Sequence, residues 1–131
     1  MSIESVMPSN HLILCFYNAE ELKALTRKAY LYVHCALIEV EGLSCAEAVM
    51  EGVVPVIGEG RLIATPQFAL DERSLFPVSD SRALAERIDW WIEHPEERIE
   101  MGKRYVESIR KFNAEDSTRQ IIQMYKDSIA R

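Results

Sequence analysis

The sequence lacks the features that mark a disulfide-rich, zinc-binding or membrane-spanning protein. Its three cysteines, Cys15, Cys35 and Cys45, are odd in number, have no C-x-x-C spacing and lie in apolar segments. We therefore expect buried, reduced thiols rather than a disulfide or a zinc site. No stretch approaches the roughly 18 apolar residues of a membrane span, and no basic region precedes a long apolar run at the N-terminus. These absences predict a cytoplasmic protein with no membrane span of its own.

Positive charge is also scarce. The chain has 15 Lys and Arg residues against 21 Asp and Glu residues, which gives a formal net charge of -6. It therefore lacks the broad cationic surface that binds a nucleic-acid backbone, and we expect no nucleic-acid partner. A small phosphorylated ligand is still compatible with this charge, because the N–H groups at a helix N-terminus can hold a diphosphate in an acidic protein.

The length and composition fit one globular domain. The chain has 131 residues, of which 48% are hydrophobic and 27% charged, and this is the ordinary balance of a protein with one hydrophobic core. Residues 1–10 show no periodic pattern and contain Pro8, so they are predicted to form an irregular lead-in. The domain itself is predicted to cover residues 11–131.

Short apolar runs alternate with helical patterns in the first part of the chain. Each run has the composition of a strand that is covered on both faces. The runs are residues 11–17, 30–36 and 53–57, with a weaker candidate at 75–78. Asn18 caps a short helix after the first run, and Gly52 ends a second helix before the third run. The alternation predicts an α/β, Rossmann-like parallel sheet with helices on both faces.

Three helices are predicted to close the chain. Asp80 caps a helix whose apolar stripe includes Trp91, and Pro95 occupies the first position of the next helix. Asn113 caps a last helix over about residues 114–130, so the C-terminus is predicted to be helical.

The segment from Glu39 to Val56 has the clearest functional pattern. It places Glu39 and Glu47 eight residues apart around a strand-to-helix turn, where ligands of doubly wound sheets bind. The backbone amides of Gly42, Leu43 and Ser44 would suit a diphosphate at a helix N-terminus. Structural alternatives stay open: Glu47 completes an S-x-x-E capping box with Ser44, and Glu39 is a solvated loop carboxylate.

This segment resembles the E-x7-E signature of the retaining glycosyltransferases of family 4, the glycosyl transferases of group 1. The residues in register are Glu39, Gly42, Leu43, Glu47, Ala48, Gly52, Pro55 and Val56. The similarity continues through residues 75–85, which are similar to the family's L-x-x-P-x-x-D-x-x-x-L-A, and through Arg98 to Gly102, which are similar to its R-x-x-M-G. It covers about residues 11–130.

The resemblance implies the donor-binding, C-terminal half of a GT-B fold. It assigns to Glu47 a hydrogen bond with the ribose of a nucleotide diphosphate sugar, and it places Glu39, a catalytic candidate, near the transferred sugar. The backbone of Gly42, Leu43 and Ser44 would contact the sugar and phosphate. The implied reaction transfers a hexose, from a donor such as a UDP- or GDP-sugar, with retention, to a glycan or glycolipid. No cofactor and no metal are implied.

Two departures from the family pattern bear on these expectations. Val40 and Glu41 replace a usual glycine and aromatic, which leaves the identity of the donor open. Family members also have an N-terminal acceptor domain, and an Arg and a Lys that neutralise the diphosphate, and this sequence is expected to begin after both. We therefore expect a fragment that is inactive alone and partnered by the missing domain, with self-association through exposed apolar faces such as that of the last helix.

Other functional interpretations follow from the same residues. The first alternative is a non-catalytic Rossmann-like binding or interaction module derived from a glycosyltransferase. Another is a nucleotide-sugar epimerase, although its catalytic pattern is not visible. His34 is interpreted as a partly buried structural histidine and Arg61 as a solvated loop residue.

Overall fold

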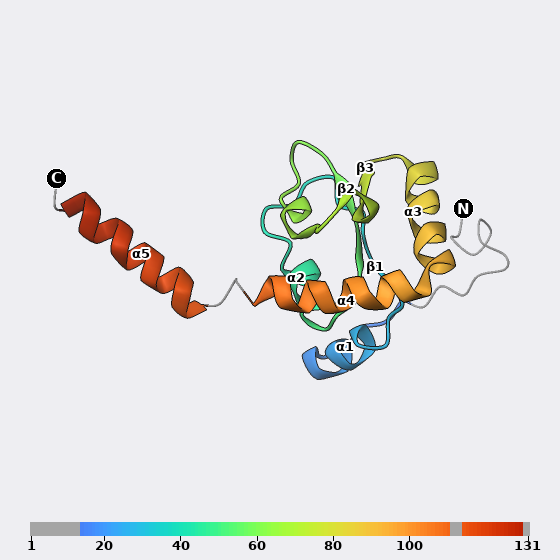
Figure 1. The fold of residues 1–131 in the computed structure, drawn as a ribbon, viewed down its shortest axis with the longest axis horizontal. Coiled ribbons are helices and arrows are strands. Elements are labelled where there is room, and N and C mark those ends of the chain that lie inside the picture. The colour runs from blue at the N-terminus through green and yellow to red at the C-terminus, as the bar shows by residue number, and fades with distance from the viewer. Residues whose placement is uncertain (1–13, 111–113, 130–131) are drawn as a thin grey trace.

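The computed structural model describes residues 14–110 and 114–129 (Figure 1). Three parallel strands form one sheet in the order β1-β2-β3. Their bounds are Tyr32–His34 for β1, Pro55–Glu59 for β2 and Leu75–Pro77 for β3. Val33 pairs with Val56 and Ile57 pairs with Leu75. The parallel α/β architecture predicted from the sequence is confirmed, and Pro55 opens β2, where its missing N–H is tolerated.

Within residues 14–110 and 114–129, five α-helices and two 3-10 turns accompany the sheet. The helices are α1 (Ala19–Thr26), α2 (Leu43–Met50), α3 (Ser81–Glu93), α4 (Pro95–Ile109) and α5 (Ala114–Ile129), and the turns are η2 (Thr65–Phe68) and η3 (Glu72–Ser74). The predicted N-caps Asn18 and Asp80 both accept hydrogen bonds from the first helical turn, and Pro95 opens α4. The predicted cap Asn113 lies outside the described residues.

The core lies where α2, α3 and α4 meet the sheet. Trp91 of α3 and Tyr105 of α4 are fully buried there. The Trp91 indole donates to the Arg73 carbonyl over 3.1 Å, and the Tyr105 hydroxyl donates to Ser74 Oγ over 2.8 Å. These bonds tie both helices to the segment around η3. The buried core residues are Cys45, Val49, Val54, Val56, Ile57, Phe76, Trp91, Met101 and Tyr105.

Two glycines allow α4 to approach the end of α2. Gly52 follows α2 with a φ of 79°, the left-handed conformation that was predicted for it as a C-terminal cap. A Cβ atom on Gly102 of α4 would lie 2.5 Å from the Gly52 carbonyl oxygen. Any side chain at residue 102 would therefore push α2 and α4 apart, which gives a physical reason for the glycine of the R-x-x-M-G pattern.

The predicted strand over residues 11–17 is wrong in its described part. Residues 14–17 form no strand, and Leu14 and Phe16 are exposed. Among the described residues, β1 is an edge strand, so this apolar run has no neighbouring strand to pair with. The prediction of buried thiols is also wrong for Cys15 and Cys35, which are exposed, and right for Cys45. Burial raises the pKa of the Cys45 thiol to about 12.

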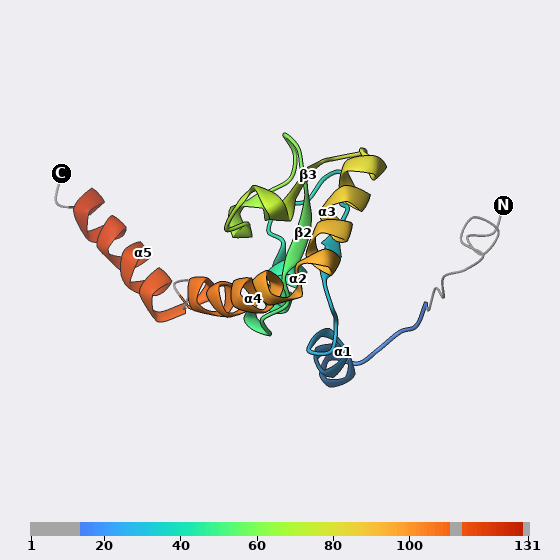
Figure 2. The same cartoon turned by 45° about the vertical axis from the view of Figure 1, so that its right-hand side comes forward.

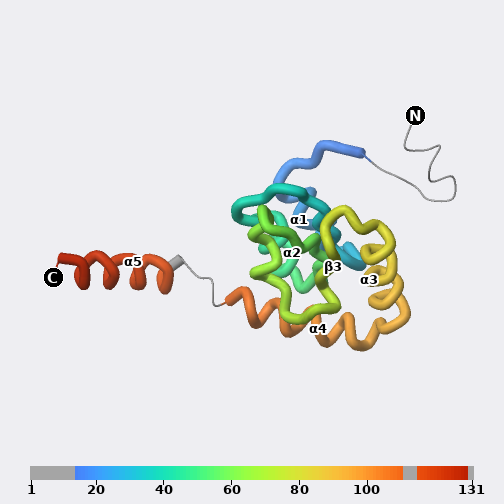
Figure 3. The backbone as a smooth tube through the Cα atoms, turned by 90° about the horizontal axis from the view of Figure 1, so that it is seen from above, coloured from blue at the N-terminus to red at the C-terminus, as the bar shows by residue number. Residues whose placement is uncertain are grey.

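The helices differ in how closely they join this core. α2 contacts β1, β2 and α4, and α3 contacts β2 and β3. Figure 2 shows α1 standing below the sheet, and Figure 3 shows α5 well apart from the other elements. None of the described helices is long and apolar enough to cross a bilayer.

Candidate functional site

The turn between β1 and α2 lies beside the loop that follows β2. The Glu39 N–H donates to the Leu62 carbonyl over 2.9 Å, and the Ala64 N–H donates to the Glu39 carbonyl over 3.0 Å. Both loops leave the carboxyl ends of adjacent parallel strands, so they meet at one edge of the sheet, as predicted for the E-x7-E segment.

Gly42 starts α2 from a left-handed conformation with a φ of 72°. A Cβ atom there would lie 2.9 Å from Thr65 Oγ1, so glycine meets both a conformational and a steric requirement. No side chain caps this helix, and the predicted Ser44–Glu47 capping box is wrong. The helix already begins at Leu43, and the Ser44 hydroxyl bonds to the Tyr32 hydroxyl over 2.8 Å instead.

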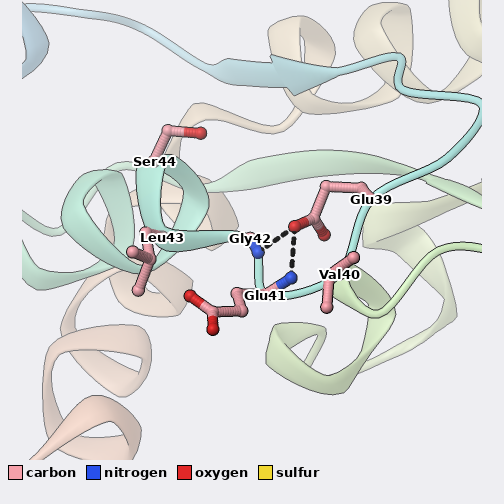
Figure 4. Close-up of a pocket in the computed structure, with 6 residues that line it drawn as sticks. All are labelled: Glu39, Val40, Glu41, Gly42, Leu43 and Ser44. Carbon is pink, nitrogen blue, oxygen red and sulfur yellow. Dashed lines mark hydrogen bonds between the residues drawn. The ribbon is translucent and has the colours of Figure 1, made fainter.

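The Glu39 carboxylate is turned back onto this turn. It accepts hydrogen bonds from the Glu41 and Gly42 N–H groups (Figure 4). It also accepts one from the Thr65 hydroxyl. The Thr65 hydroxyl is the main cause that holds the pKa of Glu39 below its usual value, and the two backbone N–H groups add to the effect. Glu39 is therefore an ionised, hydrogen-bonded group rather than a solvated loop carboxylate.

The predicted backbone donors of the turn are not equivalent. The Gly42 N–H is already bonded to Glu39, so it does not point to an open site. The Leu43 and Ser44 N–H groups are in the first turn of α2, where no preceding helical carbonyl can accept from them. Those two N–H groups remain for an anion at the positive end of the helix.

His34 and Tyr32 extend the contacts of Glu39 into the sheet. His34 Nε2 lies 3.1 Å from the hydroxyl of Thr65, which is fully buried. His34 Nδ1 lies 3.2 Å from the Tyr32 hydroxyl. The half-buried, hydrogen-bonded ring fits the structural role predicted for His34. Sequence reasoning did not select Tyr32 or Thr65, because no local motif links Thr65 to a glutamate 26 residues away.

Glu47, the second glutamate of the pair, has a different environment. Its exposed side chain lines a hollow of about 600 Å³ between α1 and α2, and it forms no hydrogen bond or ion pair with another described residue. The described residues that line the hollow are Ala19, Glu20, Leu22, Lys23, Thr26, Tyr32, Ser44, Glu47, Met50 and Glu51. Glu47 therefore offers free acceptor atoms beside Ser44 and the start of α2.

Charge in the hollow is mostly negative. Lys23 is its one basic residue among the described lining residues, and Lys23 Nζ lies 3.7 Å from the Glu51 carboxylate. Arg27 forms a second ion pair with Glu51. Arg61 is an exposed loop residue, as predicted. No group of three or more potential metal ligands occurs among the described His, Cys, Asp and Glu residues.

The fold and the turn define an α/β protein with a candidate ligand site at the carboxyl ends of parallel strands. Residues 2–112 match the family described as glycosyl transferases group 1, and the chain belongs to that family. The resemblance recognised in the E-x7-E segment is thereby confirmed.

A solved structure gives a second, independent match. The chain is similar to the crystal structure of the catalytic domain of cholesterol-alpha-glucosyltransferase from Helicobacter pylori, with 44% identity and a TM-score of 0.72. The match covers 75% of this chain and 62% of that chain, so this protein spans less than two thirds of its solved relative. No protein with a curated description matches significantly. The likeness confirms the Rossmann-like α/β fold of a GT-B glycosyltransferase domain.

Proposed function

We propose that this chain binds the nucleotide diphosphate sugar of a glycosyltransferase that moves a hexose to its acceptor with retention. The observation that carries the proposal is the unpaired Glu47 carboxylate, which faces the hollow beside the Leu43 and Ser44 N–H groups. A carboxylate is an acceptor-only group and suits the two hydroxyls of a ribose. The N-terminus of α2 suits the diphosphate.

Glu39 has a different part in this proposal. Its carboxylate is committed to three donors, so it does not act as a mobile base. It holds a negative charge next to the place where the sugar would lie, and glycosyl transfer develops positive charge on the sugar ring. We assign to Glu39 the support of that charge and of the turn around the sugar.

The surroundings of the turn favour an acceptor with an apolar part, which a glycolipid or a lipid has and a free glycan lacks. Five large apolar side chains on the two paired loops and at the first position of α2 are 64–81% exposed. They are Leu37, Ile38, Val40, Leu43 and Leu62. The similar structure is named for a glucosyltransferase of cholesterol, and an exposed apolar surface of this kind often marks an interaction site. We propose a lipid or a glycolipid as the acceptor.

The chain by itself is proposed to bind the donor but to transfer the sugar poorly. Stabilising a departing diphosphate is a large part of such catalysis. In the described part of the hollow, the positive charge comes from Lys23, which Glu51 already partly neutralises. We therefore propose that transfer requires the partner domain and further cations. The proposal includes no resident cofactor.

Calorimetric titration with UDP, GDP, UDP-glucose and GDP-mannose tests donor binding. We expect saturable binding of one nucleotide class, weakened about tenfold by Glu47→Ala because the acceptor for the ribose hydroxyls is lost. Glu93→Ala, at an exposed position on α3 far along the chain from the hollow, is the matched control and should bind as the wild type does.

The alternative, a non-catalytic module that kept the fold, predicts a different result. It expects no saturable binding of any of the four ligands, or binding that Glu47→Ala leaves unchanged. Either outcome would overturn the proposed donor site.

A further inference from the structure

Five side chains form a continuous hydrogen-bonded row beneath the turn. The row runs from Ser44 through Tyr32, His34 and Thr65 to Glu39. Its members come from β1, the start of α2, the β1–α2 turn and η2, and Thr65 is fully buried. The row joins the start of the helix that would face the diphosphate to the carboxylate that would face the sugar.

For a neutral His34 ring, the chemistry of the groups gives the row one direction of donation. Ionised Glu39 can only accept, so the Thr65 hydroxyl donates to it. The Thr65 oxygen then accepts from His34 Nε2–H, and His34 Nδ1 accepts from the Tyr32 hydroxyl. The Tyr32 oxygen accepts from the Ser44 hydroxyl. This order requires the Nε2–H tautomer of a neutral ring, because a ring with protons on both nitrogens could not accept from Tyr32.

The row also determines the shape of the turn. Thr65 Oγ1 would lie 2.9 Å from a Cβ on Gly42, so the hydroxyl is packed directly against that residue. The same hydroxyl holds the carboxylate that accepts from the Glu41 and Gly42 N–H groups. Without the Thr65 hydroxyl, the Glu39 carboxylate could rotate away from the turn. The Glu41 and Gly42 N–H groups would then lose their acceptor, and the left-handed turn that starts α2 would be less well fixed.

We propose that Thr65 and His34 are positioning residues for the donor site. They hold the Glu39 carboxylate against the turn, and through it they fix the direction of the Leu43 and Ser44 N–H groups. The inference rests on the proposed function for its effect on binding, but the hydrogen-bonded row itself is a property of the free protein. Neither residue needs to touch the donor.

Nuclear magnetic resonance of the ligand-free protein tests the row directly. We expect the His34 ring nitrogens to show the Nε2–H tautomer. We expect the Gly42 amide proton to resonate far downfield, as in a charge-assisted hydrogen bond. Thr65→Val should abolish the downfield shift, and Thr65→Ser, which keeps the hydroxyl, should preserve it.

Nucleotide binding is the second measurement on the same variants. The Kd for the bound nucleotide should rise about tenfold in Thr65→Val and stay within about twofold in Thr65→Ser, as expected for one lost hydrogen bond. The Trp91 indole signal, from a group bonded to Arg73 in the core, reports whether each variant is folded. If Thr65→Val does not fold, Tyr32→Phe replaces it and should shift the His34 Nδ1 resonance.

The outcomes separate this inference from the proposed function. An Nδ1–H tautomer, or an unchanged Gly42 amide in a folded Thr65→Val, contradicts the row whatever the nucleotide does. The expected signals with no nucleotide binding by the wild type overturn the proposed function and the effect on binding, but leave the row intact. Equal affinities of the wild type and folded Thr65→Val would overturn the positioning role.

Discussion

The two helices that enclose the hollow have the same length and are held in place by different means. α2 and α1 each have eight residues. Cys45, Ala48 and Val49 of α2 are fully buried, whereas no residue of α1 is buried. α1 has a complete capping box between Asn18 and Glu21, which α2 lacks. Good local capping therefore does not decide which helix is fixed to the core.

The difference indicates how the site is built. α2, with the turn, Ser44 and Glu47, is joined to the hydrophobic core and to α4. Among the described residues, α1 and its C-cap Arg27 are linked to Glu51, the C-cap of α2, by ion pairs from Lys23 and Arg27, whose side chains are more than half exposed. Such exposed pairs contribute about 0–1 kcal/mol. We infer that α2 is the firm wall of the hollow and α1 is its weak wall.

The largest loss of stability is expected from Gly102→Ala, which disturbs the contact between α4 and the end of α2, the firm wall. A helical Gly→Ala change is ordinarily stabilising by about 1 kcal/mol. Here the new Cβ would meet the Gly52 carbonyl oxygen at 2.5 Å, and backbone on both sides must move. We expect a loss of about 3 kcal/mol in the free energy of unfolding, measured by urea denaturation. Gly58→Ala, whose nearest neighbours lie at 3.4 Å, is the control and should lose less than about 1 kcal/mol.

Gly42→Ala is expected to cost about 2 kcal/mol, because it combines left-handed strain with displacement of Thr65. Gly52→Ala is the matched control, since its φ of 79° is similar and its nearest neighbour, Val106, lies at 3.4 Å. Gly52→Ala should cost about 1 kcal/mol, the strain alone. Thermal unfolding of the two variants checks the difference, and equal losses would show that the Thr65 contact is unimportant.

Tyr105→Phe tests how α4, the helix that packs against α2, is fixed to the core, and its expected effect on stability is smaller. It removes the hydroxyl that donates to Ser74 and accepts from the Leu70 N–H over 3.2 Å. Leaving these groups unpaired in a buried site should cost about 1–2 kcal/mol of stability. Tyr125→Phe on α5, where the side chain is exposed, should leave the urea midpoint unchanged. A neutral Tyr105→Phe would mean that water replaces the hydroxyl.

The smallest loss of stability is expected from Glu51→Gln, which removes the ion pairs that hold α1, the weak wall. Glu51→Gln should lower global stability by less than about 1 kcal/mol, because the ion pairs are solvent-screened. It should nevertheless speed hydrogen exchange of the α1 amides, while the α2 amides stay protected. Glu107→Gln, at an exposed position on α4, is the control. Faster exchange of the α2 amides than of the α1 amides would show that α1, not α2, is the more firmly held helix.

The same contact predicts a pH dependence. Arg27, and then Lys23, hold the pKa of Glu51 below its usual value. A lowered folded-state pKa means that the contribution is present above the unfolded-state pKa of about 4.3 and is lost as the pH falls through the folded value. Protection of the α1 amides should therefore decrease below about pH 4, and Glu51→Gln should remove this dependence.

Most of the described fold could be predicted, because its signals are local. The caps Asn18 and Asp80, the left-handed Gly52 and the first-turn Pro95 each depend on neighbours within a few residues. The run at 11–17 was misleading, since apolar composition shows a preference for burial but cannot supply a partner strand. The extent of the domain over residues 11–131 stays a prediction.

The location of the candidate site could be predicted from the sequence, but most of its side-chain contacts could not. The spacing of Glu39 and Glu47 located the turn and the helix start. The capping box failed because Gly42 lets the helix begin one residue before Ser44, and the Tyr32 hydroxyl engages Ser44. Thr65 could not be selected, since only folding brings it to Glu39. The roles of Glu39 and Glu47 toward a donor stay predictions.

The most direct test of the donor site is an amide resonance titration of this chain with UDP and GDP. We expect saturable shifts that are largest at Leu43, Ser44 and Glu47, with smaller shifts along α1, and a loss of these shifts in Glu47→Ala. Shifts centred away from the α1–α2 hollow, or no saturable shift with either nucleotide, would contradict a donor site in this hollow.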